Sequence, residues 1–207
     1  MPKIVPIVEG PGEVGAVPVL LRRFQAECRR WDFEIERPKN AHGRGNLTKE
    51  GGLERFLQHA SHVQNCRVIL VIMDSEDECP KDIGTNFVER ALSLNMLPAI
   101  FFVFPKRNFE SWFAASLPTL RGLRAGASFD GDVENRGGKA ILNEWMPPGR
   151  IYKETMDQAP MTKYMNFGLI RPRSRSFRRM ENAFREIREI VDHPPPRGYV
   201  SPQLEEE

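Results

Sequence analysis

Four segments of the chain have the apolar pattern of β-strands. Residues 68–73 form an unbroken apolar run rich in β-branched side chains, which is typical of a strand buried on both faces of a parallel sheet. Residues 99–104 have the same character, residues 3–8 are mostly apolar, and residues 31–36 alternate between apolar and acidic side chains. Because helix-like segments separate these runs, the pattern predicts an α/β fold with a mostly parallel four-stranded sheet, covered by helices on both faces.

Beyond the last predicted strand the pattern becomes helical. We therefore expect residues 1–115 to form the α/β core and residues 116–207 to form a helical C-terminal extension packed on the same unit. The tail from about residue 194 reads HPPPRGYVSPQLEEE. Its proline and charge content predicts that it is loosely ordered.

Acidic residues follow the most apolar of these strands. Four of the five residues after Met73 are acidic: Asp74, Glu76, Asp77 and Glu78. Two carboxylates about 4 Å apart repel by roughly 1 kcal/mol in water and by about 4 kcal/mol near a protein surface. Since ligands of open α/β sheets bind at the carboxyl ends of the strands, this crowding predicts a cation at that edge.

The first predicted strand also ends in an acid, Glu9. If the chain stays extended after residue 73, alternate side chains group Asp74 with Glu76 and leave Asp77 on the other side. Magnesium prefers hard oxygen ligands, usually one or two carboxylates together with waters and substrate phosphate. Glu9, Asp74 and Glu76 would supply them.

The turn after the first strand permits a second interpretation. Gly10, Gly12 and Gly15 match the GxGxxG fingerprint of dinucleotide-binding proteins, with Glu36 at the end of the next strand. Glu9 and Glu13 oppose it, because they bring negative charge to the place where a pyrophosphate would meet a helix N-terminus. A P-loop is excluded, since Ala16 and Val17 stand where lysine and serine or threonine are required.

Composition adds few constraints. The net charge of +2 does not identify a nucleic-acid-binding protein, so any electrostatic footprint has to be local. The three scattered cysteines suit a reducing compartment better than disulfides or zinc. With no apolar run of about 18 residues and no signal-peptide layout, we expect a cytoplasmic protein without a membrane span. Oligomeric state is left open.

Five motifs occur in a fixed order along the chain: VEGPGE, DSEDECP, FPKRNFESWFAAS, YKETMDQAP and SRSFRR. Together they resemble the Toprim-like bacterial family called domain of unknown function 4276, over about residues 3–190. VEGPGE and the strand ending in acids are also similar to the Toprim domains of topoisomerases, primases and overcoming-lysogenization-defect (OLD) nucleases. The resemblance implies a Toprim-like fold that binds Mg²⁺ or Mn²⁺.

In the Toprim pattern, a glutamate after the first strand and an Asp-x-Asp after a later strand bind magnesium. Carried over by position, these residues are Glu9, Asp74 and Glu76, which the resemblance makes metal ligands and catalytic residues. Glutamate in place of aspartate at position 76 lengthens the side chain by one methylene. Asp77 is therefore the alternative ligand.

Three further residues are candidates for the same site. Glu110, in FESWF, is a candidate ligand, and Lys106 is a candidate phosphate contact with a catalytic role. Glu13 is either a second ligand or an acid that stabilises the start of the helix through its dipole.

A local basic segment, RPRSRSFRR, precedes and begins the last predicted helix. Its arginines are Arg171, Arg173, Arg175, Arg178 and Arg179. Cations at a helix start oppose the helix dipole, so an anion nearby would be favourable. A phosphate backbone would supply one. The arginines do not distinguish DNA from RNA, although we expect DNA in preference to RNA as the partner. The alternative is a solvated basic face or a protein contact.

The function implied by the resemblance is a Mg²⁺- or Mn²⁺-dependent Toprim-type nuclease that hydrolyses phosphodiester bonds. OLD nucleases carry an ATPase in the same chain and this sequence shows none, so the resemblance implies a separate ATPase partner. It also implies a role in bacterial defence against phage. The alternatives are a noncatalytic Toprim-like binding or regulatory partner and a dinucleotide-binding enzyme. A phospho-receiver domain is disfavoured, because it would have a pair of acidic residues after the first strand, where this chain has a glycine turn.

Overall fold

The computed structural model describes residues 1–201 and contains one parallel sheet. Its strands are β1 (Lys3–Val8), β2 (Glu34–Ile35), β3 (Lys39–Asn40), β4 (Cys66–Ile72) and β5 (Ala99–Val103). The spatial order is β2-β1-β4-β5, with β3 pairing to β1 further along the same edge. The predicted α/β class is confirmed, together with the mostly parallel sheet and the helical C-terminal part. Five strands replace the expected four, because the polar pair Lys39–Asn40 adds a short strand that apolar patterning does not reveal.

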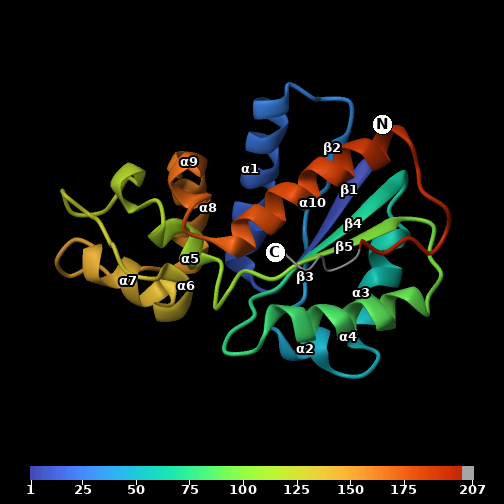
Figure 1. The fold of residues 1–207 in the computed structure, drawn as a ribbon, viewed down its shortest axis with the longest axis horizontal. Helices are drawn as coiled ribbons and strands as arrows, with labels where there is room; N and C mark the ends of the chain where they lie inside the picture. The colour runs from blue at the N-terminus through green and yellow to red at the C-terminus, as the bar shows by residue number, and fades with distance from the viewer. Residues whose placement is uncertain (202–207) are drawn as a thin grey trace.

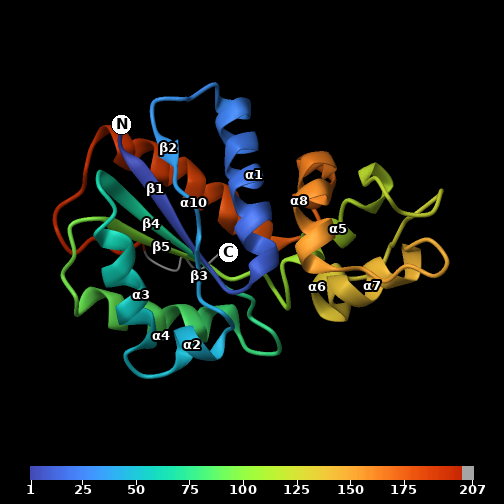
Figure 2. The same cartoon turned by 180° about the vertical axis from the view of Figure 1, so that it is seen from behind.

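Helices cover both faces of the sheet, as Figures 1 and 2 show from opposite sides. On one face lie α1 (Pro11–Cys28) and α10 (Arg175–Asp192), packed on strand residues such as Ile4 and Val8. On the other lie α3 (Gly52–Ser61) and α4 (Pro80–Leu92), packed on Val5 and Ile7. Alternate strand residues thus enter two separate cores, which explains the unbroken apolar run of β4. A short helix, α2 (Gly45–Thr48), precedes α3.

The chain between β5 and α10 forms a helical lobe beyond one end of the sheet (Figure 1). It contains α5 (Glu110–Ala114), a 3-10 turn (Leu117–Thr119), α6 (Val133–Arg136), α7 (Gly138–Trp145), α8 (Glu154–Tyr164) and α9 (Phe167–Ile170). Aromatic contacts join this lobe to the core under α1 and α10. The ring of Phe24 lies 4.9 Å from that of Phe167, and the ring of Trp112 lies 5.4 Å from that of Phe177. The lobe and the sheet therefore share one hydrophobic core.

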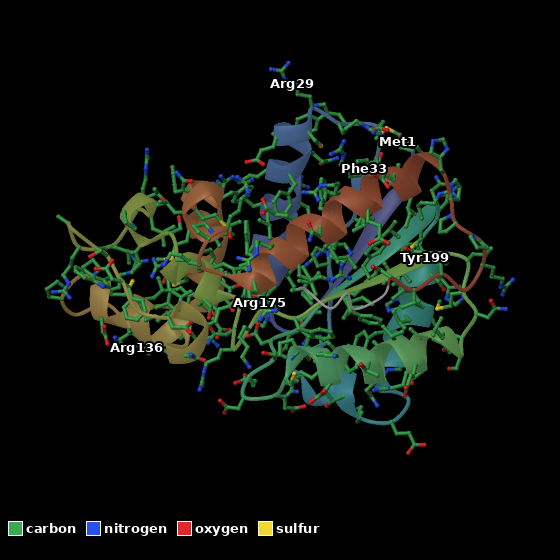
Figure 3. All side chains as sticks on the ribbon, viewed as in Figure 1. Met1, Arg29, Phe33, Arg136, Arg175 and Tyr199 are labelled. Carbon is green, nitrogen blue, oxygen red and sulfur yellow. The ribbon has the colours of Figure 1, made fainter. Side chains whose placement is uncertain are left out.

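The end of the chain differs from the expectation of a loosely ordered tail. Ile100 in β5 donates its backbone N–H to the carbonyl of Tyr199 and accepts a hydrogen bond from the N–H of Ser201. Figure 3 shows Tyr199 beside this strand. Residues 198–201 thus cover the free edge of β5, and backbone pairing of this kind cannot be read from composition. The rest of the predicted tail, residues 202–207, lies outside the described residues. Within residues 1–201, the structure contains no helix with both the length and the apolar character needed to cross a membrane.

Candidate metal centre

Glu9 and Asp74 lie side by side at the carboxyl edge of the sheet. Strands β1 and β4 run parallel with Val8 opposite Ile72, so the residues that follow them emerge together. The backbone N–H of Asp74 donates to Oε2 of Glu9 at 3.2 Å. Burial raises the pKa of Glu9, and the carboxylates of Glu13 and Glu76 raise it further. The two predicted ligands are therefore neighbours in an environment that disfavours their charge.

A third acid, Glu110, joins them from the first turn of α5. Asp74 and Glu110 are 7% and 0% exposed. The N–H of Phe109, next to Glu110, donates to Oδ1 of Asp74 at 2.9 Å, which fixes the start of α5 against the end of β4. Burial raises the pKa of Asp74 well above its usual value, and the carboxylates of Glu110, Glu13 and Glu9 add to that rise. Burial likewise raises the pKa of Glu110.

Helix α8 and the segment that leads into it orient two of these acids. Nε2 of Gln158 donates to Oε1 of Glu110 at 2.9 Å and to Oε1 of Glu13 at 3.3 Å. The hydroxyl of Tyr152 donates to the same Glu110 oxygen at 2.9 Å. Two acceptors remain unsatisfied in the described structure, Oε2 of Glu110 and Oε1 of Gln158, although both residues are completely buried. Buried acceptors without a donor are costly, so a proton, a water or a cation would stabilise this spot.

Of the two roles that the sequence left open for Glu13, the structure shows the one at the helix start, and the role of metal ligand stays a prediction. Glu13 lies in the first turn of α1, where its Oε2 accepts a hydrogen bond from the N–H of Gly10 at 3.0 Å and so caps the helix. Its Oε1 faces Gln158 and the acid cluster. We call Glu9, Glu13, Asp74 and Glu110 the acid cluster from here on.

The other predicted acids lie at the rim. Glu76 is exposed and has a φ of 52°, so the chain does not stay extended after Asp74 and the expected alternation is interrupted. Its carboxylate still acts electrostatically on Glu9. Asp77 is 82% exposed and pairs with Arg107 at 2.9 Å. Residue 76 still pairs with Arg107, but its positive φ interrupts the alternation of side chains, and Asp77 pairs with Arg107 and not with the acid cluster.

Lys106, the predicted phosphate contact, lies against the loop that follows β4, and its contact with phosphate stays a prediction. Lys106 donates to the backbone carbonyl of Glu78 at 3.1 Å and so braces the loop after β4. Two further cations act on the acid cluster: Arg44 on Glu9, and Lys139 on Asp74 and Glu110. No motif or periodicity in the sequence around Arg44 or Lys139 predicted that either residue would lie near the acids. The motif that contains Tyr152 and Gln158 was visible in the sequence, but no role could be assigned to it.

The glycine turn serves packing between helices. A Cβ atom at Gly12 would lie 2.4 Å from Oε1 of Gln158 and 2.9 Å from Cβ of Glu154, so only glycine permits α8 to approach α1 this closely. Glu36, the expected ribose ligand, pairs with Lys3 at 2.8 Å. Because α8 and the Glu13 carboxylate occupy the start of α1, the geometry opposes a pyrophosphate there.

The arginine segment lies at the start of α10, and Figure 3 shows Arg175 at that point. Its members contact protein groups: Arg171 pairs with Glu181, Arg179 donates to Ser201, and Arg173 and Arg178 donate to backbone carbonyls. Arg175 is exposed. These contacts stabilise the entry into α10, and binding of nucleic acid by the segment stays a prediction.

The family resemblance implies a divalent ion, and the acid cluster fits one in its chemistry. It offers hard carboxylate oxygens, one of them buried without a donor. Its geometry is not that of a finished metal site. In the part of the chain that the structure describes, no three His, Cys, Asp or Glu side chains are placed so that they could hold an ion together. Binding would therefore require rotation of a carboxylate or bridging waters.

The raised pKa values of Glu9, Asp74 and Glu110 predict how stability depends on pH. Above the ordinary carboxyl pKa near 4, the folded state holds protons that the unfolded chain releases, so metal-free protein should lose stability as the pH rises from about 4 towards neutral. We expect its Tm in EDTA to fall by about 2–5 °C over this range. Thermal unfolding monitored by circular dichroism would measure it, and Glu110→Gln should reduce the fall. A Tm that rises over this range, in both proteins, would contradict the assignment.

The acid cluster combines residues from three of the motifs on which the Toprim resemblance rests. Glu9 and Glu13 come from VEGPGE, Asp74 from DSEDECP and Glu110 from FESWF, and the helix α8 that orients them carries the fourth motif. The resemblance itself stays a prediction. In comparisons with protein-family models, with curated proteins and with solved structures, nothing was found to match this chain.

Proposed function

We propose that this protein is a Mg²⁺- or Mn²⁺-dependent nuclease that hydrolyses phosphodiester bonds of nucleic acid. The observation that carries the proposal is the acid cluster: four carboxylates at the carboxyl edge of a parallel sheet, three of them nine-tenths or more buried. Such a cluster costs stability unless a cation compensates it. The position is also where open α/β sheets bind their ligands.

In this proposal Glu9, Asp74 and Glu110 hold the ion, with Glu13 close enough to add a ligand and Glu76 at the rim. A divalent ion held there would lower the pKa of a bound water, so that a hydroxide nucleophile is available near neutral pH, and would neutralise charge on the phosphate. The chain's own contribution is positioning. The N–H of Phe109 orients Asp74, and Tyr152 orients Glu110.

The nucleic acid, DNA in preference to RNA, is proposed from the resemblance and from the arginine segment. Arg175 and its neighbours would contact the phosphate backbone at the start of α10. A cytoplasmic role in defence against phage, with a separate ATPase partner, rests on the resemblance alone.

A cleavage assay tests the proposal directly. Wild-type protein should cut plasmid DNA or single-stranded DNA with Mn²⁺ or Mg²⁺ and be inactive in EDTA. Glu9→Gln and Asp74→Asn should each lower the rate at least about 100-fold, because each removes a ligand from the ion. Asp77→Asn is the matched control: the side chain is exposed and paired with Arg107, so its rate should stay within about twofold.

One observation favours the second candidate, a noncatalytic binding or regulatory partner. The described residues contain no ready three-carboxylate group, and the second acid of the Toprim pattern is the exposed Glu76. If purified protein leaves DNA and RNA intact with both metals, yet still binds Mn²⁺, the nuclease proposal fails and the binding role replaces it.

A further inference from the structure

Lys139 is held beside the acid cluster by the packing of α7. A Cβ atom at the preceding residue, Gly138, would lie 1.9 Å from the carbonyl carbon of Glu110. The N–H of Gly138 donates to Oδ1 of Asn108 at 3.0 Å. These two contacts hold the first turn of α7 against the start of α5 and the residues just before it. The backbone of Lys139 therefore cannot move away from Glu110 without breaking them.

The side chain of Lys139 is held by an acid outside the cluster. Its Nζ pairs with Oε1 of Glu154, the first residue of α8. Glu154 in turn packs against Gly12 at the start of α1. The ion pair thus spans the starts of α7 and α8, next to the helix that carries Glu13. The side chains of Lys139 and Glu154 are 46% and 36% exposed, so the ammonium can exchange partners without crossing the core.

Lys139 partly compensates the buried charge. Burial and the neighbouring acids raise the pKa of Asp74, and the ammonium of Lys139 opposes that rise, as it also does for Glu110. Arg44 acts on Glu9 in the same way, but two positive charges are still too few for four carboxylates. A divalent ion among the four carboxylates would compensate more negative charge than the ammonium does. It would also repel the ammonium, because like charges close together repel more strongly in a protein than in water.

We propose that Lys139 is the counter-cation of the acid cluster in the metal-free protein and contacts the substrate's phosphate once a divalent ion has bound. The second half rests on the proposed function; the first half does not. Still paired with Glu154 and partly exposed, the ammonium would stand at the exposed edge of the acid cluster, where an anionic phosphate would approach. A lysine binds phosphate there as a mobile point charge.

Two binding measurements test this, both without catalysis. In a calorimetric Mn²⁺ titration, Lys139→Gln should bind the ion about three- to tenfold more tightly than wild type, because a competing cation is gone. In fluorescence anisotropy with a labelled single-stranded DNA and Ca²⁺, the same variant should bind about tenfold more weakly. Lys139→Arg keeps the charge and should stay near wild type in the titration. Lys163→Gln, an exposed lysine in the last turn of α8, is the control for loss of one charge.

Unchanged or weaker Mn²⁺ binding in a folded Lys139→Gln variant would overturn the counter-cation role. Unchanged DNA binding in that variant, or an equal loss in Lys163→Gln, would overturn the phosphate contact. Failure of the proposed function looks different: wild-type protein would bind Mn²⁺ no better than Asp74→Asn, or would bind Mn²⁺ and leave DNA and RNA intact in the cleavage assay. Circular dichroism melts of each variant confirm that the compared proteins are folded.

Discussion

Gly138→Ala is expected to destabilise the protein by about 3 kcal/mol or more and to abolish Mn²⁺ binding. The added methyl group would lie 1.9 Å from the carbonyl carbon of Glu110 and 2.1 Å from its oxygen. Both are backbone atoms in the first turn of α5, so no side-chain rotation can relieve the overlap. Either α7 separates from α5 or Glu110 leaves the acid cluster. Thermal and urea unfolding would measure the first effect, and calorimetry the second.

Gly45→Ala is the matched control for this variant. Gly45 is the first residue of α2, and a Cβ atom there meets nothing within 4 Å. Alanine at this position should be neutral or stabilise the protein by about 0.5 kcal/mol, through the lower entropy of the unfolded chain. Equal Tm values for Gly138→Ala and Gly45→Ala would show that the contact between α5 and α7 is not as close as described.

Asp74→Asn is expected to stabilise the metal-free protein while removing its response to metal. The carboxylate is 7% exposed, is surrounded by other acids, and accepts a hydrogen bond from the N–H of Phe109. An asparagine oxygen can accept the same hydrogen bond without the buried charge. We expect the Tm in EDTA near pH 7.5 to rise by about 3 °C or more. In wild type, saturating Mn²⁺ should raise the Tm by several degrees; in the variant it should not.

Asp77→Asn should show neither change, since its side chain lies in solvent. A lower Tm for Asp74→Asn in EDTA would mean that the carboxylate is satisfied without a cation. That outcome would remove the main support for a metal at this place.

The fold was readable because β4 is so strongly patterned. Its uninterrupted apolar run requires cover on both faces, and the two cores of the structure provide it. The apolar pattern did not predict the elements that are held only by backbone hydrogen bonds. Strand β3 has two polar residues, and the segment that covers β5 lies in a stretch of low apolar content. Neither segment has the alternation of apolar and polar residues by which a strand is predicted.

The sequence predicted the site residues that lie at strand ends. It did not predict the residues whose position depends on how the helices pack. Glu9 and Asp74 come together because parallel strands end at one edge. Glu110 came from the family resemblance. The roles of Gln158 and Lys139 depend on α7 and α8 packing against α5, which no local pattern encodes. The exposure of Glu76 depends on a single residue at positive φ, and glutamate carries no signal for that conformation.

The most direct test of the shared metal site is anomalous diffraction from crystals of the whole protein grown with Mn²⁺. The acid cluster predicts one strong anomalous peak coordinated by Glu9 and Asp74, with Glu110 or Glu13 as a further ligand. Crystals that show no peak there, or a peak bound only by Glu76 and Asp77 at the rim, would contradict it.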